Sequence, residues 1–159
     1  MTIVPVVFNA LIVFAAKYLF LAIPAAALIY WILAPAATRK YLILLGVIVG
    51  VASIVIGRLI AHVYFDPRPF VTGHFTPLIP HDPDNGFPSD HTLLSSAIAA
   101  TVTACSRPVG IALWVITAIV AVARVTAGLH APIDVIGSIC IAGVIAAVAH
   151  VLLRRAFPQ

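Results

Sequence analysis

Long apolar runs dominate the chain and are separated by short polar stretches. A helix that crosses a bilayer needs about 20 consecutive, mostly apolar residues. Four segments come close to or meet that requirement, namely residues 41–63, 90–106, 108–125 and 131–153. The connections between them are short, except for the polar stretch before residue 90. This pattern predicts a helical membrane protein with at least four spans.

The N-terminal stretch 3–35 is too long for one span and too short for two, and Lys17 and Pro24 interrupt it. We interpret residues 4–16 as a short interfacial or re-entrant helix and residues 18–35 as the first span. A sixth span is the alternative. The predicted fold is therefore an all-α integral membrane protein. It is a bundle of five to six transmembrane helices with an N-terminal interfacial or re-entrant helix, and residues 1–159 form a single domain.

Composition supports a membrane protein and excludes several other classes. Of the 159 residues, 63% are hydrophobic and 9% are charged, whereas a soluble domain carries about 25% charged residues. This excludes an ordinary cytosolic domain and a disordered chain. The net charge is +4, but the bases are scattered and form no stripe that fits a phosphate backbone. We therefore expect the bilayer as a partner and no nucleic acid.

The charged residues predict how the chain is oriented. With alternating spans, five bases and no acid fall on one side: Arg39, Lys40, Arg107, Arg154 and Arg155. Basic residues in short loops mark the cytoplasmic side of a membrane. All five acids fall on the opposite side: Asp66, Asp82, Asp84, Asp90 and Asp134. We therefore expect a multi-pass protein of the cell membrane whose acidic side faces out of the cytoplasm.

Three polar groups, at residues 66–70, 87–91 and 124–134, lie at span ends that alternation brings to this outer side. Two of them contribute Arg68 and Arg124, whose planar guanidinium groups suit phosphate oxygens. Ser89 adds a hydroxyl donor just before a span, where backbone N–H groups also favour anions. The predicted ligand at this face is a phosphate.

The same groups contain side chains suited to proton transfer or nucleophilic attack. His91 and His130 have pKa values near neutrality in their ordinary state. Asp134 lies four residues after His130, so one helix face would carry both if the helix begins by residue 130. The carboxylate would then hold one ring nitrogen and leave the other directed at substrate. From the residues alone, either histidine is a candidate nucleophile.

In this order, these residues resemble the signature of the type 2 phosphatidic acid phosphatase superfamily of integral membrane phosphatases. Arg68-Pro69 resembles the end of the first motif, Pro88-Ser89-Asp90-His91 the second, and Arg124, His130 and Asp134 the third at the family's spacing. The resemblance implies a reaction without metal or other cofactor.

The resemblance also implies residue roles. His130 would attack phosphorus to form a phosphohistidine, Asp134 would orient it, and His91 would protonate the leaving oxygen. Phosphate oxygens would be bound by Arg68, Arg124 and Ser89.

Three positions depart from the family pattern. Ala61 stands where the first motif has lysine, and Arg58, one turn earlier, is our candidate for the missing phosphate-binding cation; His62 is a weaker substitute. Ala123 replaces a serine. Asp90 replaces the glycine of the second motif, so its motif position places it at the phosphate site. We expect its carboxylate to point outward or to cap the helix.

The sequences around Arg68 and His91 look like the bacterial branch that dephosphorylates undecaprenyl diphosphate. This resemblance implies a prenyl diphosphate lipid as substrate and a role in carrier-lipid recycling for cell-wall synthesis. One alternative is a phosphatase for phosphatidylglycerophosphate, phosphatidate or a lipid A phosphate. Another is a non-catalytic binder or transporter of lipid phosphates, because of the three departures. Histidines and aspartates between residues 66 and 88 match no familiar metal-ligand spacing, and the sequence does not indicate an oligomeric state.

Overall fold

The computed structural model describes residues 3–156, and regular structure in this part is helical apart from one isolated antiparallel bridge between Pro67 and Asn85. In chain order the elements are α1 (Ile3–Lys17), the short 3-10 helix η1 (Leu19–Leu21), α2 (Ala22–Leu33), α3 (Ala36–Val63), α4 (Pro69–Thr72), α5 (Asp90–Thr103), α6 (Arg107–Thr126) and α7 (Pro132–Ala156). The all-α architecture that we predicted is confirmed.

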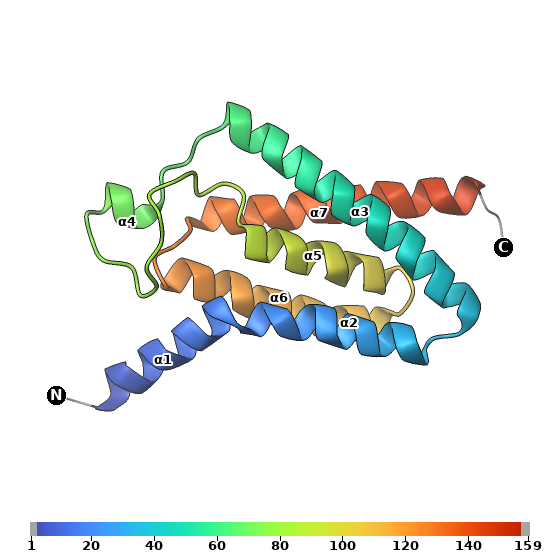
Figure 1. Cartoon of the computed structure of the whole chain (residues 1–159), viewed down its shortest axis with the longest axis horizontal. Helices are drawn as coiled ribbons and strands as arrows, with labels where there is room; N and C mark the ends of the chain where they lie inside the picture. The colour runs from blue at the N-terminus through green and yellow to red at the C-terminus, as the bar shows by residue number, and fades with distance from the viewer. Residues whose placement is uncertain (1–2, 157–159) are drawn as a thin grey trace.

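Helix α5 lies at the centre of the bundle and packs against α2, α3, α6 and α7 (Figure 1). Its buried residues include Thr92, Ser95, Ser96 and Thr101. Small side chains allow helices to approach closely in a membrane. Since neighbouring helices surround α5, it can bury these hydroxyl groups and does not need a continuous apolar surface.

By length and composition, the described residues contain three to four candidate membrane spans, compared with the predicted five to six. Among the described residues, α3, α6 and α7 are long and apolar enough to cross a membrane. Helix α1 and the η1–α2 segment add a fourth span if they are one broken element, with a bend of 41° between them. Helix α5 has 14 residues, which at about 1.5 Å per residue is shorter than the bilayer core of about 30 Å. The predicted helix over 4–16 is present as α1.

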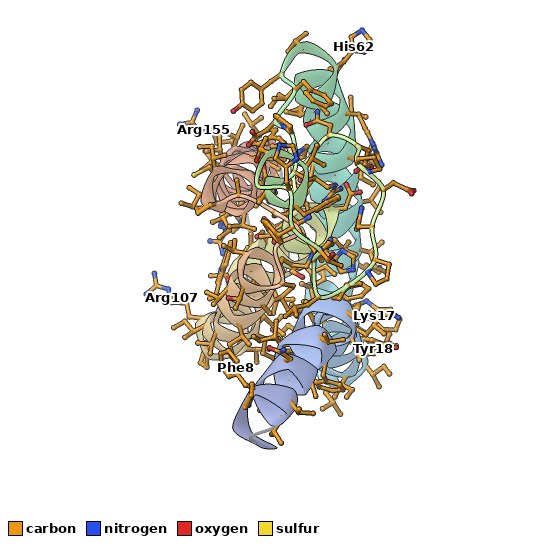
Figure 2. All side chains as sticks on the ribbon, turned by 90° about the vertical axis from the view of Figure 1, so that its left-hand side faces the viewer. Phe8, Lys17, Tyr18, His62, Arg107 and Arg155 are labelled. Carbon is orange, nitrogen blue, oxygen red and sulfur yellow. The ribbon has the colours of Figure 1, made fainter. Side chains whose placement is uncertain are left out.

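The two ends of the bundle differ in charge. The start of α3, the turn from α5 to α6 and the end of α7 lie at one end, and the long loop 64–89 lies at the other (Figure 1). Consequently the basic positions 39, 40, 107, 154 and 155 belong to one end, and all five aspartates belong to the loop end. Figure 2 views the bundle from the loop end.

Candidate functional site

A cavity of about 530 Å³ at the loop end collects most of the predicted site residues. It is lined by residues of all three motifs, and Arg58, Arg68, Asp90, His91, Arg124 and His130 are among them. We call it the arginine cavity. A wider cavity of about 800 Å³ between α1 and the loop also touches His130, but it reaches neither arginine of the motifs nor His91. The chemistry suggested by the motifs is therefore concentrated in the arginine cavity.

His130 lies in the turn before α7 and is 2% exposed. Its Nδ1 lies 2.9 Å from the backbone carbonyl oxygen of Gly86. Because a carbonyl oxygen only accepts, Nδ1 carries the hydrogen in this arrangement and the lone pair of the neutral ring is on Nε2. That Nε2 lies 3.1 Å from Nη2 of Arg124 and 3.4 Å from Nη1 of Arg68. The lone pair therefore faces two guanidinium groups, where an anion would be held.

The surroundings of His130 favour its neutral form. Burial lowers the pKa of its imidazole. The positive charges of Arg124 and Arg68 act in the same direction, whereas the Asp134 carboxylate raises the pKa. A neutral imidazole with a free Nε2 lone pair is the state that nucleophilic attack requires.

Asp134 lies beside His130, as the four-residue spacing predicted, although His130 precedes the first helical residue, Pro132. The Oδ2 atom of Asp134 is 3.4 Å from Nδ1 of His130 and accepts a hydrogen bond of 2.8 Å from the backbone N–H of Ala131. Its Oδ1 atom is buried without a hydrogen-bond partner among the described residues. The nearer acceptor for His130 is the Gly86 carbonyl, which the sequence did not reveal. The aspartate and Gly86 hold the same ring nitrogen together.

The two motif arginines are both 5% exposed and are fixed by protein oxygens. Arg68 donates from Nε to Asp84 and from Nη1 to the backbone oxygen of Leu129. Although burial alone would raise the pKa of Asp84, the hydrogen bond and charge of Arg68 lower it. Arg124 donates from Nη1 to the backbone oxygen of Ala16 at 3.5 Å. These contacts leave other guanidinium N–H groups directed at His130.

The remaining predicted residues differ in position. Ser89 is fully buried, does not line the arginine cavity, and accepts a hydrogen bond from the Thr92 hydroxyl. Asp90 is exposed, as expected, and its carboxylate lies 3.9 Å from Arg58. His62 points away from the bundle (Figure 2) and does not line the cavity, so it cannot supply the missing cation there.

Asn85 connects three parts of the site and was not predicted from the sequence. Its Nδ2 donates to the backbone oxygens of Ala61 and Tyr64 at the end of α3, at 3.0 and 2.9 Å. Its Oδ1 accepts from the N–H groups of Asp66 and Phe87, at 2.9 and 3.1 Å. These bonds fix the backbone on both sides of Gly86. An Asn-Gly pair indicates a turn, but nothing in the sequence links this turn to His130.

The break between α1 and α2 also contributes to the site. The ring of Phe20 in η1 lies edge-on to that of His91, with 4.4 Å between centroids. The Ala16 carbonyl that accepts from Arg124 belongs to the last turn of α1, where carbonyl groups have no partner within the helix. Lys17 and Tyr18 lie at this corner (Figure 2). The N-terminal segment therefore contacts two of the predicted site residues.

Comparison with known proteins identifies the family. The model of the PAP2 superfamily matches residues 40–158. The chain belongs to the PAP2 superfamily. This membership confirms the resemblance found in the sequence and makes the protein a membrane lipid phosphatase.

Two relatives and one solved structure are informative within the PAP2 superfamily. Undecaprenyl-diphosphatase BcrC of Bacillus subtilis (strain 168) is 37% identical over 139 residues, covering 87% of this chain and 72% of that protein. Bacitracin transport permease protein BcrC of Bacillus licheniformis is 30% identical over 129 residues, covering 80% of this chain and 63% of that protein. A PAP2-type phosphatidylglycerolphosphate phosphatase from Bacillus subtilis has a similar fold. Its TM-score is 0.53 at 18% identity, and the alignment covers 98% of this chain and 88% of that one.

Proposed function

We propose that this PAP2 protein hydrolyses undecaprenyl diphosphate to the monophosphate and inorganic phosphate. The observation that carries the proposal is the position of Nε2 of His130, which lies within 3.4 Å of the guanidinium groups of both Arg68 and Arg124. The 37% identity to a protein named undecaprenyl-diphosphatase supports the choice of substrate.

In the proposed reaction, the terminal phosphoryl group binds to Arg68 and Arg124. The Nε2 lone pair of His130 forms a bond to phosphorus while the bond from phosphorus to the bridging oxygen breaks. His91 gives a proton to that oxygen, and the lipid leaves as the monophosphate. Water then attacks the phosphohistidine and gives a proton to His91, which releases phosphate and frees His130. The two guanidinium groups stabilise the charge on the equatorial oxygens in both steps.

Roles for the other predicted residues follow from their positions. The Asp134 carboxylate and the Gly86 carbonyl keep the hydrogen on Nδ1 and stabilise the positive charge that develops on the ring. Ser89 stays a predicted phosphate ligand, although reaching a phosphate would require its hydroxyl to be accessible from the cavity.

The shape of the arginine cavity suits a lipid. Its lining continues from the site along α3 and α5, past Gly57 and Leu93 to Gly50 and Ala97. These residues are small or apolar and lie below the charged end of the bundle. We place the start of the prenyl chain there.

The charge difference between the ends of the bundle supports an extracytoplasmic site. Five bases lie at the end away from the loop, and the positive-inside rule assigns such an end to the cytoplasm. The arginine cavity would then open on the outer side, where carrier lipid accumulates as the diphosphate after its glycan has been transferred. The protein would recycle that lipid for cell-wall synthesis.

Phosphate release from purified protein in detergent tests the proposal. Undecaprenyl diphosphate should be the best substrate in a panel with phosphatidylglycerophosphate, phosphatidate and lipid A. The His130→Ala variant should release no phosphate, whereas His62→Ala, which removes an exposed histidine outside the cavity, should match the wild type. A phosphohistidine should be trapped when the wild type is quenched rapidly with alkaline detergent, because the bond from phosphorus to nitrogen is stable in alkali and broken by acid. Full activity of His130→Ala would refute the mechanism. Tight binding without turnover of any substrate would instead indicate a lipid-phosphate binder.

A further inference from the structure

Arg58 lines the cavity, but among the described residues its guanidinium has no hydrogen bond to a carbonyl or carboxylate oxygen. Its side chain is 74% exposed, and the one ion pair recorded for it among the described residues is the 3.9 Å contact with Asp90, which is 71% exposed. By contrast, Arg68 and Arg124 are 5% exposed and hydrogen-bonded to protein oxygens. Arg58 is thus the exposed cation of the cavity, whereas the other two are buried and hydrogen-bonded inside it.

Along the cavity, charged residues come first and apolar residues follow, just as the two phosphates of a lipid diphosphate are followed by its hydrocarbon chain. His130 and the two fixed arginines form the inner end. His91 follows on the first turn of α5, and Arg58 and Asp90 face each other from α3 and α5 at the mouth. Beyond this pair, Gly57 approaches Leu93 closely, because a Cβ on Gly57 would be 3.0 Å from Leu93. The charged part of the cavity therefore borders directly on its apolar part.

The position of Arg58 on its helix agrees with this order. Residues 50, 54, 57, 58 and 61 of α3 all line the cavity, as expected for one face of a helix. From Arg58 to Gly50 the helix rises about 12 Å, so Arg58 is at the charged end of an apolar wall. A group bound by Arg58 would lie between the inner phosphate site and the lipid chain.

We propose that Arg58 binds the proximal phosphate of a prenyl diphosphate, the one that stays on the lipid, and so selects diphosphate over monophosphate lipids. This inference rests on the proposed function and refines it. It also differs from the expectation that Arg58 replaces the missing family lysine at the transferred phosphate. In the free protein the Asp90 carboxylate lies 3.9 Å from the guanidinium of Arg58, and the proximal phosphate takes its place beside that guanidinium when substrate binds.

Inhibition measurements separate the two phosphates. The probes are a prenyl methylene-bisphosphonate and a prenyl phosphonate with the same chain, tested as competitive inhibitors of phosphate release from a prenyl diphosphate. Arg58→Ala should weaken inhibition by the bisphosphonate about 10-fold or more, the size expected for a hydrogen bond between charged groups. Inhibition by the phosphonate should change less than 2-fold, and Arg58→Lys should recover part of the loss. Lys40→Ala, which removes an exposed cation from the far end of α3, is the matched control.

Asp90→Asn gives a result of opposite sign. Without the competing carboxylate, the bisphosphonate should bind more tightly. If the ion pair between Arg58 and Asp90 were merely structural, Arg58→Ala and Asp90→Asn would both weaken inhibition by the bisphosphonate. If Arg58→Ala weakens inhibition by both compounds equally, Arg58 binds the transferred phosphate. If it weakens inhibition by neither, Arg58 binds no phosphate of the lipid. Each result overturns the inference. Turnover by the wild type tests the proposed function separately. If the wild type hydrolyses no prenyl diphosphate, the proposed function fails first.

Discussion

Replacing Gly86 by alanine tests whether the backbone around His130 positions this proposed nucleophile. A Cβ at this residue would lie 2.9 Å from Oδ2 of Asp134 and 3.1 Å from the backbone oxygen of Asp66. Ordinary contacts of a Cβ begin at 3.4 Å, so the carboxylate would have to move by about 0.5 Å. It is 1% exposed and bonded to the Ala131 N–H, and therefore has little room to yield.

The displacement should reduce catalysis more than binding. Overpacking of this kind costs about 1–3 kcal/mol of stability. The Gly86 carbonyl and Asp134 both face Nδ1 of His130, so their movement rotates the ring. A misplacement of about 1 Å can lower a rate about 100-fold. We expect Gly86→Ala to lower kcat by about 10- to 100-fold with a smaller change in KM.

Steady-state phosphate release and the thermal midpoint should be measured for Gly86→Ala and for Gly143→Ala. A Cβ on Gly143 meets no atom within 4 Å, so this control should keep full activity. If Gly86→Ala lowers kcat by displacing Asp134, the same substitution should lower kcat much less in an Asp134→Ala background. Wild-type kcat for Gly86→Ala, or strictly multiplicative losses in the double variant, would refute the reasoning.

Four further predictions concern the surroundings of the same histidines. Asn85→Ala should lower the thermal midpoint and kcat together, since it removes four hydrogen bonds worth about 0.5–1.5 kcal/mol each; an unchanged midpoint would contradict this. Because burial and the arginines lower the pKa of His130, activity should persist below pH 6.5 and decline only as pH falls through the lowered value. Asp134→Asn removes the group that raises that pKa, so the acid limb of kcat/KM should move to still lower pH, and a move upward would be inconsistent. Phe20→Ala should lower kcat by up to about 10-fold through lost contact with His91, and the loss should vanish for a nitrophenyl phosphate, whose leaving group needs no proton.

The sequence was sufficient to predict that the motifs meet at one end of the bundle. Hydrophobic runs of near-spanning length alternate in direction, so the ends of α3 and α6 and the starts of α5 and α7 have to lie together. This conclusion did not require α5 to be a full span. The count of spans was less predictable, because hydropathy does not distinguish a helix that faces lipid from one surrounded by other helices. Helix α5 is surrounded by other helices, and it buries the hydroxyl groups of Ser95 and Ser96.

The contacts that position the reactive groups could not be predicted from the sequence. Gly86, Asn85 and Phe20 act through a backbone carbonyl, a loop hydrogen-bond network and a helix break. None of these has a periodicity or a spacing that marks it. A motif shows which side chains carry the chemistry, whereas the partners that fix their geometry depend on tertiary contacts 44 residues apart in the chain, as between Gly86 and His130.

The charges of the arginine cavity favour the proposed phosphate site over a structural network of ion pairs. Arg68 has a carboxylate partner in Asp84, but among residues 3–156 no carboxylate lies within ion-pair distance of Arg124, and its Nε has no hydrogen-bond partner. Burying a cation without a counter-charge is costly, and a second guanidinium nearby adds repulsion. The neutral ring of His130 accepts from Arg124 at Nε2 but supplies no counter-charge. A dianionic phosphoryl group would satisfy the free N–H groups of both arginines at once, so the arrangement that is unfavourable in the free protein becomes favourable when substrate binds.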